Sequence, residues 1–184
     1  MLEAAERVFV EGGAEAARME VIAERAGVAV GTLYNHFESR DDLLGAIVES
    51  HRAALLERLD RALGQSRARP FDEALGAFLH AFFEHLSEHR PLLARLVQEE
   101  GSGIGSRGKG PLLDEVTGRV ESLLRRGRAQ GALRTDPSGL QSFLLVGMLR
   151  GVLRWDAARS RSADPGALAA RVQGAFLDGQ GVRR

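Results

Sequence analysis

The stretch VGTLYNHF, residues 30–37, carries the side chains whose types and spacing point most clearly to a chemistry. On a helix that advances about 100° per residue, Leu33 and Phe37 lie on one side. The opposite side presents four small or polar residues, namely Gly31, Thr32, Tyr34 and Asn35. An asparagine amide can bond twice to an adenine edge, and hydroxyl groups can donate to phosphates. The pattern therefore predicts a short helix that offers a polar face to the major groove of DNA.

Other short helices must position this face. Apolar residues recur at helical spacing between residues 2 and 9, and Gly12-Gly13 is expected to stop that first helix. They recur again between residues 19 and 26, and a turn at Gly27-Val28 separates this second helix from the third. Two short helices joined by a tight glycine-containing turn form the helix-turn-helix pattern.

The motifs IAERAGV, GTLYNHF and the Ser39-Arg40 pair resemble the DNA-binding head of the tetracycline-repressor (TetR) family of bacterial regulators. The upstream LEAAERVFVEGG resembles the first helix of that head, so the match covers residues 2–48. The resemblance implies a helix-turn-helix domain at 1–48 and a ligand-binding and dimerisation domain at 49–184. It places DNA contacts at Gly31, Thr32, Tyr34, Asn35, His36 and Arg40. It further implies a homodimer that binds a palindromic double-stranded DNA operator and responds to a small-molecule effector. The expected location is the cytoplasm, because neither a signal peptide nor a membrane-spanning run is evident.

The remaining sequence also has helical patterning. Ser39 followed by Asp42 fits a capping box that opens a longer helix to about Leu63. Later apolar stripes predict helices near 71–86, 91–98, 112–130, 137–160 and 164–178, and the glycine-rich 101–111 reads as a flexible loop. Aromatic residues make up only 5% of the chain and strand-like alternation is scarce. We expect an all-α protein, a three-helix head followed by a six-helix body.

Two functions of the body follow from the resemblance. A pocket for an apolar or amphipathic effector would be walled by Phe78, Phe82, Leu86, Leu96, Leu123, Met148 and Trp155. An aromatic stripe at helical spacing is equally typical of plain hydrophobic core. Dimerisation would use the last two helices, with close approach at Gly147 and Gly151 and packing at Phe176. The alternative for these helices is packing within one chain.

Other chemistries find little support. His85 and His89 have metal-ligand spacing, but Glu84 and Glu88 beside them indicate a solvated face, so we expect no metal. The 101–111 loop matches phosphate-loop patterns in part, but Gly110 stands where a magnesium-binding hydroxyl is needed. The chain has no cysteine, and no nucleophile–base pair is evident. We therefore expect neither a cofactor nor an enzyme.

Charge is distributed against expectation for a DNA-binding protein. The net charge is zero, yet residues 1–50 hold four arginines and ten acids, a net of −6, and the remainder holds +6. Glu20, early in the second helix, would repel a phosphate, and Ala29 stands where the third helix needs a capping side chain. The alternative function is therefore a TetR-like module that binds a small molecule or protein and has weak or lost DNA binding. No apolar run is long enough to span a membrane.

Overall fold

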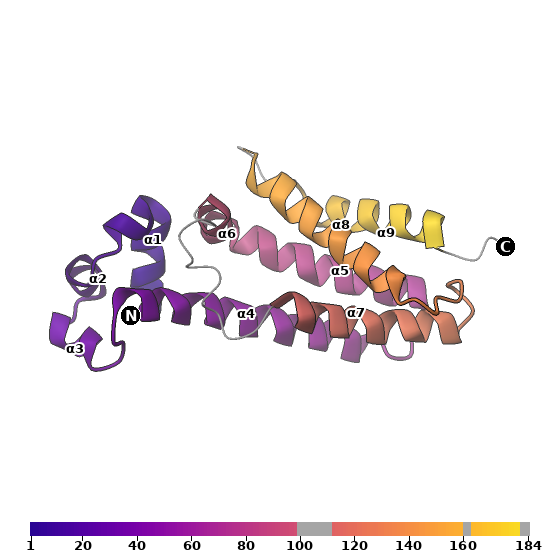
Figure 1. Ribbon diagram of the computed structural model, residues 1–184, viewed down its shortest axis with the longest axis horizontal. Coiled ribbons are helices and arrows are strands. Elements are labelled where there is room, and N and C mark those ends of the chain that lie inside the picture. Colours follow the sequence, from indigo (N-terminus) through magenta and orange to yellow (C-terminus); the bar gives the residue numbers. More distant parts are fainter. Residues whose placement is uncertain (99–111, 160–162, 181–184) are drawn as a thin grey trace. The chain divides into compact units, whose positions relative to one another are not determined.

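The computed structural model describes residues 1–98, 112–159 and 163–180, which form nine helices and no strand (Figure 1). The helices are α1 (Leu2–Ala16), α2 (Met19–Ala26), α3 (Val30–Tyr34), α4 (Arg40–Gln65), α5 (Phe71–Glu88), α6 (Arg90–Gln98), α7 (Leu112–Ala129), α8 (Leu140–Ala157) and α9 (Pro165–Gln180). The all-α fold class is thereby confirmed. The predicted 101–111 loop lies outside the described residues. None of the described helices combines the length and apolar character needed to cross a bilayer.

Two of the helix ends are informative. The first helix is interrupted at Gly13, as predicted, because its φ of 75° and ψ of −172° are non-helical, and a short further helical stretch carries α1 on to Ala16. The eighth helix begins at Leu140 and not at Pro137, because a polar turn precedes it. In that turn Asp136 accepts hydrogen bonds from the Ser138 hydroxyl and the Gln141 amide, both at 2.7 Å.

The chain divides into two compact units. The first contains Met1–Ala53 and the segment that begins at His89. Its core joins α1, α2, α3 and the start of α4 through fully buried side chains such as Phe9, Ile22 and Leu33. Leu92 of α6 completes this core, and the Arg95 guanidinium donates to the Val10 carbonyl of α1 at 3.1 Å. The first unit is therefore built from two separate stretches of sequence.

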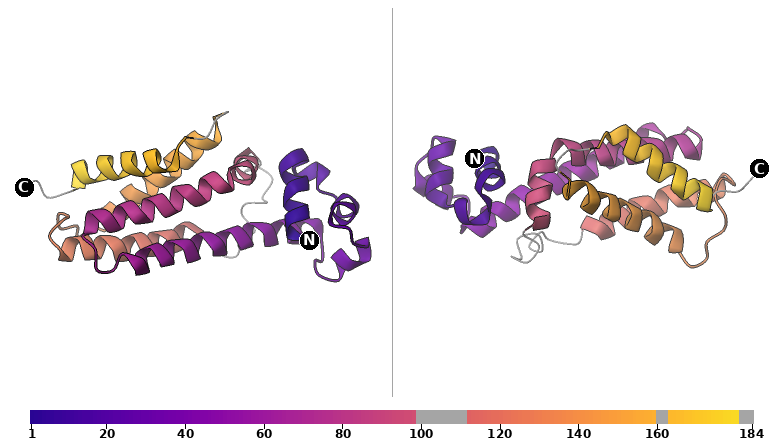
Figure 2. Two further views of the ribbon diagram at one scale, coloured as in Figure 1. Left: turned by 180° about the vertical axis from the view of Figure 1, so that it is seen from behind. Right: turned by 90° about the horizontal axis from the view of Figure 1, so that it is seen from above.

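The second unit contains Ala54–Glu88 and the chain from residue 110 onward. Helix α5 packs against α9 and α7, and α8 packs against both α7 and α9 (Figure 2). The core between them is aromatic and aliphatic, with Phe71, Phe78 and Leu79 at most 1% exposed. Burial of a phenylalanine side chain stabilises a fold by about 1.5–3 kcal/mol, so α5 contributes much of this unit's stability.

A polar network joins α7 to α8 inside the second unit. The Glu121 carboxylate accepts hydrogen bonds from the Ser142 hydroxyl and from the Arg128 guanidinium, the latter at 2.6 Å. Arg128 also donates to the Gln141 side-chain oxygen at 3.1 Å, and Gln141 donates to the Arg134 carbonyl at 3.1 Å. The Ser142 hydrogen bond, aided by Arg128, lowers the pKa of Glu121 below 4.5 despite partial burial.

Candidate nucleic-acid interface

The turn between α2 and α3 depends on one glycine. Gly27 has a φ of 68°, a left-handed conformation that costs glycine least. Its amide donates to the Glu24 carbonyl at 3.2 Å, and the Val28 amide donates to the Ala23 carbonyl at 3.0 Å. These hydrogen bonds satisfy the last carbonyls of α2 and reverse the chain into α3.

Helix α3 has one side buried in the core of the first unit and one side exposed to solvent. Leu33 is 0% exposed in the core of the first unit, whereas Tyr34 is 52% exposed. Gly31, Asn35 and His36 are also exposed, and Thr32 is half-buried. The helix ends at Tyr34, so Asn35 and His36 lie at and just beyond its C-terminus. Four of the six predicted DNA-contact residues are therefore exposed on α3 or directly after it, namely Gly31, Tyr34, Asn35 and His36.

The sixth predicted residue, Arg40, has partners within the protein. Its guanidinium donates to the Ala14 carbonyl at 3.0 Å and to Asp41 Oδ1 at 2.9 and 3.1 Å. These bonds attach the start of α4 to the end of α1. The Arg40 side chain remains 39% exposed. A structural role therefore accompanies the predicted DNA contact, and sequence spacing gave no sign of it.

Of the predicted capping box at the start of α4, the bond to the Ser39 side chain is confirmed, whereas the reciprocal bond comes from Glu38 and not from Ser39. The Asp42 amide donates to the Ser39 hydroxyl, and the Asp42 carboxylate accepts from the Glu38 amide, both at 3.1 Å. These bonds fix the segment that leads from α3 into α4. The N-terminus of α3 itself has no such cap, because Ala29 offers no side-chain acceptor.

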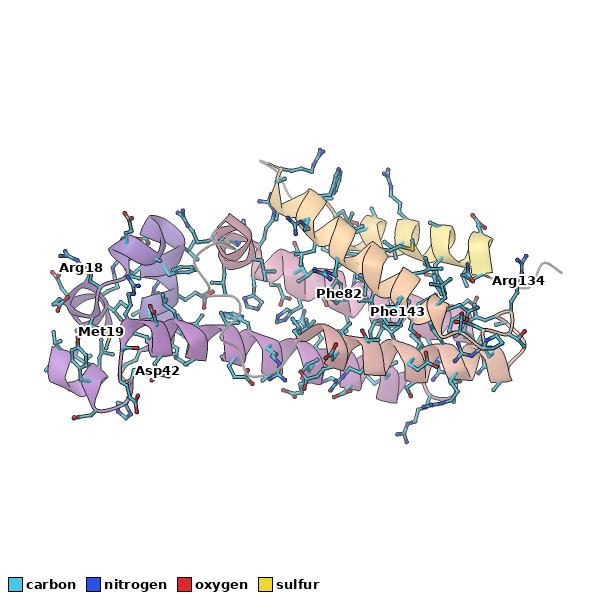
Figure 3. All side chains as sticks on the ribbon, in the orientation of Figure 1. Arg18, Met19, Asp42, Phe82, Arg134 and Phe143 are labelled. Carbon is cyan, nitrogen blue, oxygen red and sulfur yellow. The ribbon has the colours of Figure 1, made fainter. Side chains whose placement is uncertain are left out.

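Charge near the interface is scarce. Arg25 forms a bidentate ion pair with Glu11, in which the two guanidinium nitrogens lie 3.0 and 3.2 Å from the two carboxylate oxygens. Arg18, directly before α2, is exposed, and Figure 3 labels its side chain beside that helix. Arg18 is a further candidate phosphate contact, because its charge lies beside the N-terminus of α2, where anions are favoured. Its position directly before the predicted second helix is the sequence signal for this role.

The residues predicted to line an effector pocket differ in how deeply they are buried. Phe78, Phe82 and Leu123 are buried in the core of the second unit, and Leu86 and Met148 pack against it. Trp155 is 47% exposed, with the Arg159 guanidinium 4.4 Å from its ring centre. The Leu96 side chain lies outside the described residues. A role in an effector pocket stays a prediction for all seven residues.

The predicted dimer residues also differ from one another. Around Gly147 and Gly151 an added side chain would meet no atom within 4 Å, so α8 is open at both. Phe176 is 2% exposed because it packs inside the second unit. The Phe176 side chain therefore packs within one chain and is not exposed to a second subunit.

A helix-turn-helix with an exposed, polar recognition helix, followed by a helical body, defines the class of DNA-binding transcriptional regulators. Residues 1–47 match the family model described as bacterial regulatory proteins of the tetR family. The regulator NfxB of Pseudomonas aeruginosa is 31% identical over 153 residues, covering 80% of this chain and 79% of that protein. The chain therefore belongs to the TetR family of transcriptional regulators, whose members are not enzymes.

Other relatives agree with this assignment. The transcriptional repressor KstR2 of Mycobacterium tuberculosis is 26% identical over 140 residues, which cover 74% of this chain and 68% of that protein. The structure of the TetR-family regulator PfmR from Thermus thermophilus has a TM-score of 0.77 at 26% identity, covering 100% and 98% of the two chains. FadR from Bacillus subtilis, solved in complex with stearoyl-CoA, has a TM-score of 0.78 at 21% identity, covering 97% and 96%, and shares the fold.

Proposed function

We propose that this protein is a repressor that acts in the cytoplasm as a homodimer on a pseudo-palindromic operator. Each subunit inserts α3 into a major groove, with the two half-sites one helical turn or a multiple of it apart. The observation that carries this proposal is the contrast between buried Leu33 and exposed Tyr34 on a five-residue helix. An exposed tyrosine beside an exposed asparagine suits a base-reading surface better than a merely solvated one.

The proposed dimer surface is an apolar row along α8. Large side chains are exposed at helical spacing, with Leu140 55%, Phe143 71% and Leu144 43% exposed. Figure 3 labels Phe143 on α8. Gly147 and Gly151 continue the row without side chains, so another helix can approach closely there. A contiguous apolar strip is unusual on a monomer and typical of an interface. A two-fold axis would pair each row, together with α9, with its own copy.

The proposed effector is a small apolar or amphipathic molecule bound in the body. Support comes from the aromatic character of the core around Phe78 and Phe82. Two solved structures with the same fold also support it, the fatty acid degradation regulator FadR from Bacillus halodurans and the ketosteroid transcriptional regulator KstR2 of Mycobacterium tuberculosis. Such a molecule releases DNA only if it binds better to the arrangement in which α3 no longer fits the grooves.

The test measures binding of the purified dimer to DNA from its own promoter region. The double variant Tyr34→Ala/Asn35→Ala should lose at least tenfold in affinity, since each good base contact contributes about 1–3 kcal/mol. The control Gln130→Ala, exposed at the end of α7, should bind as the wild type does. Unchanged affinity of the double variant would refute the interface. A wild-type protein that binds its promoter no better than random DNA would favour the alternative, a binding module with lost DNA recognition, which the acidic head supports.

A further inference from the structure

Two histidines of the first unit lie in contact although they come from different helical segments. His51 of α4 and His89, which directly precedes α6, place their rings edge to face with centres 4.3 Å apart. One ring nitrogen of His51 lies within 4.8 Å of one ring nitrogen of His89. Two nitrogens on one tetrahedral ion, each about 2.0–2.1 Å from it, are separated by about 3.4 Å. Modest rotation of the two rings would close that difference.

A third residue orients one of these rings. The Glu6 carboxylate of α1 lies 3.0 Å from His51 Nε2. Both side chains are mostly shielded, His51 being 19% and Glu6 27% exposed. A carboxylate hydrogen-bonded to one nitrogen of an imidazole fixes the orientation of that ring. In many protein metal sites, a histidine ligand donates a hydrogen bond from its other ring nitrogen to a carboxylate, which holds the ring in the orientation that binds the metal.

We propose that His51 and His89 bind a divalent transition-metal ion of the Zn²⁺ or Ni²⁺ type, with Glu6 as the positioning residue. Imidazole nitrogens favour these ions, whereas Mg²⁺ and Ca²⁺ favour oxygen ligands. The sequence pattern around Glu84 and Glu88 predicts no metal at His85 and His89. The contact of His89 with His51 of α4 is not visible in that pattern, because it arises from helix packing. A bound ion would tie α4 to the start of α6 within the unit that carries α3.

The experiment uses the full-length protein after removal of metal with a chelator. Zn²⁺ is titrated in competition with a chromophoric chelator, and Co²⁺ is added separately to detect nitrogen coordination in its visible spectrum. The wild type should bind one Zn²⁺ per chain, and His51→Ala and His89→Ala should each lower the affinity at least tenfold. Glu6→Gln should lower it about tenfold while both ligands remain. Mg²⁺ should not compete.

The control is His80→Ala, which removes an exposed histidine from α5 and should leave Zn²⁺ affinity unchanged. Circular dichroism and the melting temperature of the metal-free variants separate loss of ligands from loss of fold. If the alanine variants unfold, His51→Gln and His89→Gln replace them. The proposal is overturned if the wild type binds no Zn²⁺ at millimolar concentration. It is equally overturned if folded His51 and His89 variants bind as tightly as the wild type.

Discussion

Arg25 and Glu11 form an ion pair on the surface of the first unit, with two nitrogen–oxygen distances of 3.0 and 3.2 Å. Arg25 lowers the pKa of Glu11, so the carboxylate stays charged and continues to hold the guanidinium. One of the four arginines among residues 1–50 is therefore neutralised locally, and Arg40 is partly engaged by Asp41. The head thus offers few available cations to DNA.

A shallow salt dependence of operator binding follows from this. Each neutralised phosphate adds about 0.9 to the slope of log affinity against log salt concentration, so we expect a slope below about 6 per dimer. Glu11→Gln should steepen the slope and tighten binding at low salt, because Arg25 is released in both subunits. Fluorescence anisotropy across a salt series measures this. The matched control is Glu57→Gln, which removes an exposed carboxylate from the part of α4 in the second unit and should change neither the slope nor the affinity. A wild-type slope well above about 6 would contradict the expectation.

A capping side chain at residue 29 should stabilise the first unit. Ala29 already has the extended backbone of a helix N-cap, with φ −68° and ψ 145°, but no side-chain hydrogen bond. Ala29→Ser would supply an acceptor for an amide in the first turn of α3 and should raise the free energy of unfolding by about 0.5–1 kcal/mol. Urea denaturation followed by circular dichroism measures the gain. Ala129→Ser, exposed at the last position of α7, should give none.

Acid should weaken the polar network between α7 and α8. The pKa of Glu121 is lowered in the folded protein, so its stabilising effect is present above pH 4.5 and is lost as the pH falls through the folded value. Glu121→Gln cannot titrate, and the stability difference between wild type and variant should therefore shrink below about pH 4.5. Melting temperatures from about pH 3 to about pH 7 measure it. A difference independent of pH would show that the Glu121 charge does not contribute.

The apolar row of α8 should control the oligomeric state. Phe143→Asp places a charge on a side chain that is 71% exposed in one chain, and we expect it to yield monomers. Light scattering after size exclusion measures the mass. Leu112→Asp makes the same kind of change at an exposed position of α7 and should leave the dimer intact. If Phe143→Asp remains dimeric, the subunits associate through another surface.

The sequence allowed much of this architecture to be predicted, because the decisive signals are local. The spacing of Leu33 and Phe37 identified the buried side of α3 and left Tyr34 on the exposed side, and Ser39 with Asp42 identified the start of α4. Contacts between distant segments left no such signal. Nothing local shows that Arg40 reaches the carbonyl of Ala14, or that His51 meets His89. Those contacts depend on helix packing, which periodicity does not encode.

Because Leu92 belongs to the core of the first unit, that core cannot be completed until α6 has been synthesised. The ribosome releases α1, α2 and α3 well before it reaches Leu92 and Arg95, which complete that core and bond to Val10. The head should therefore emerge loosely packed and become rigid only after α5 and α6 have followed it. For the same reason, a chimera that joins this head to a foreign body needs α6 as a second graft.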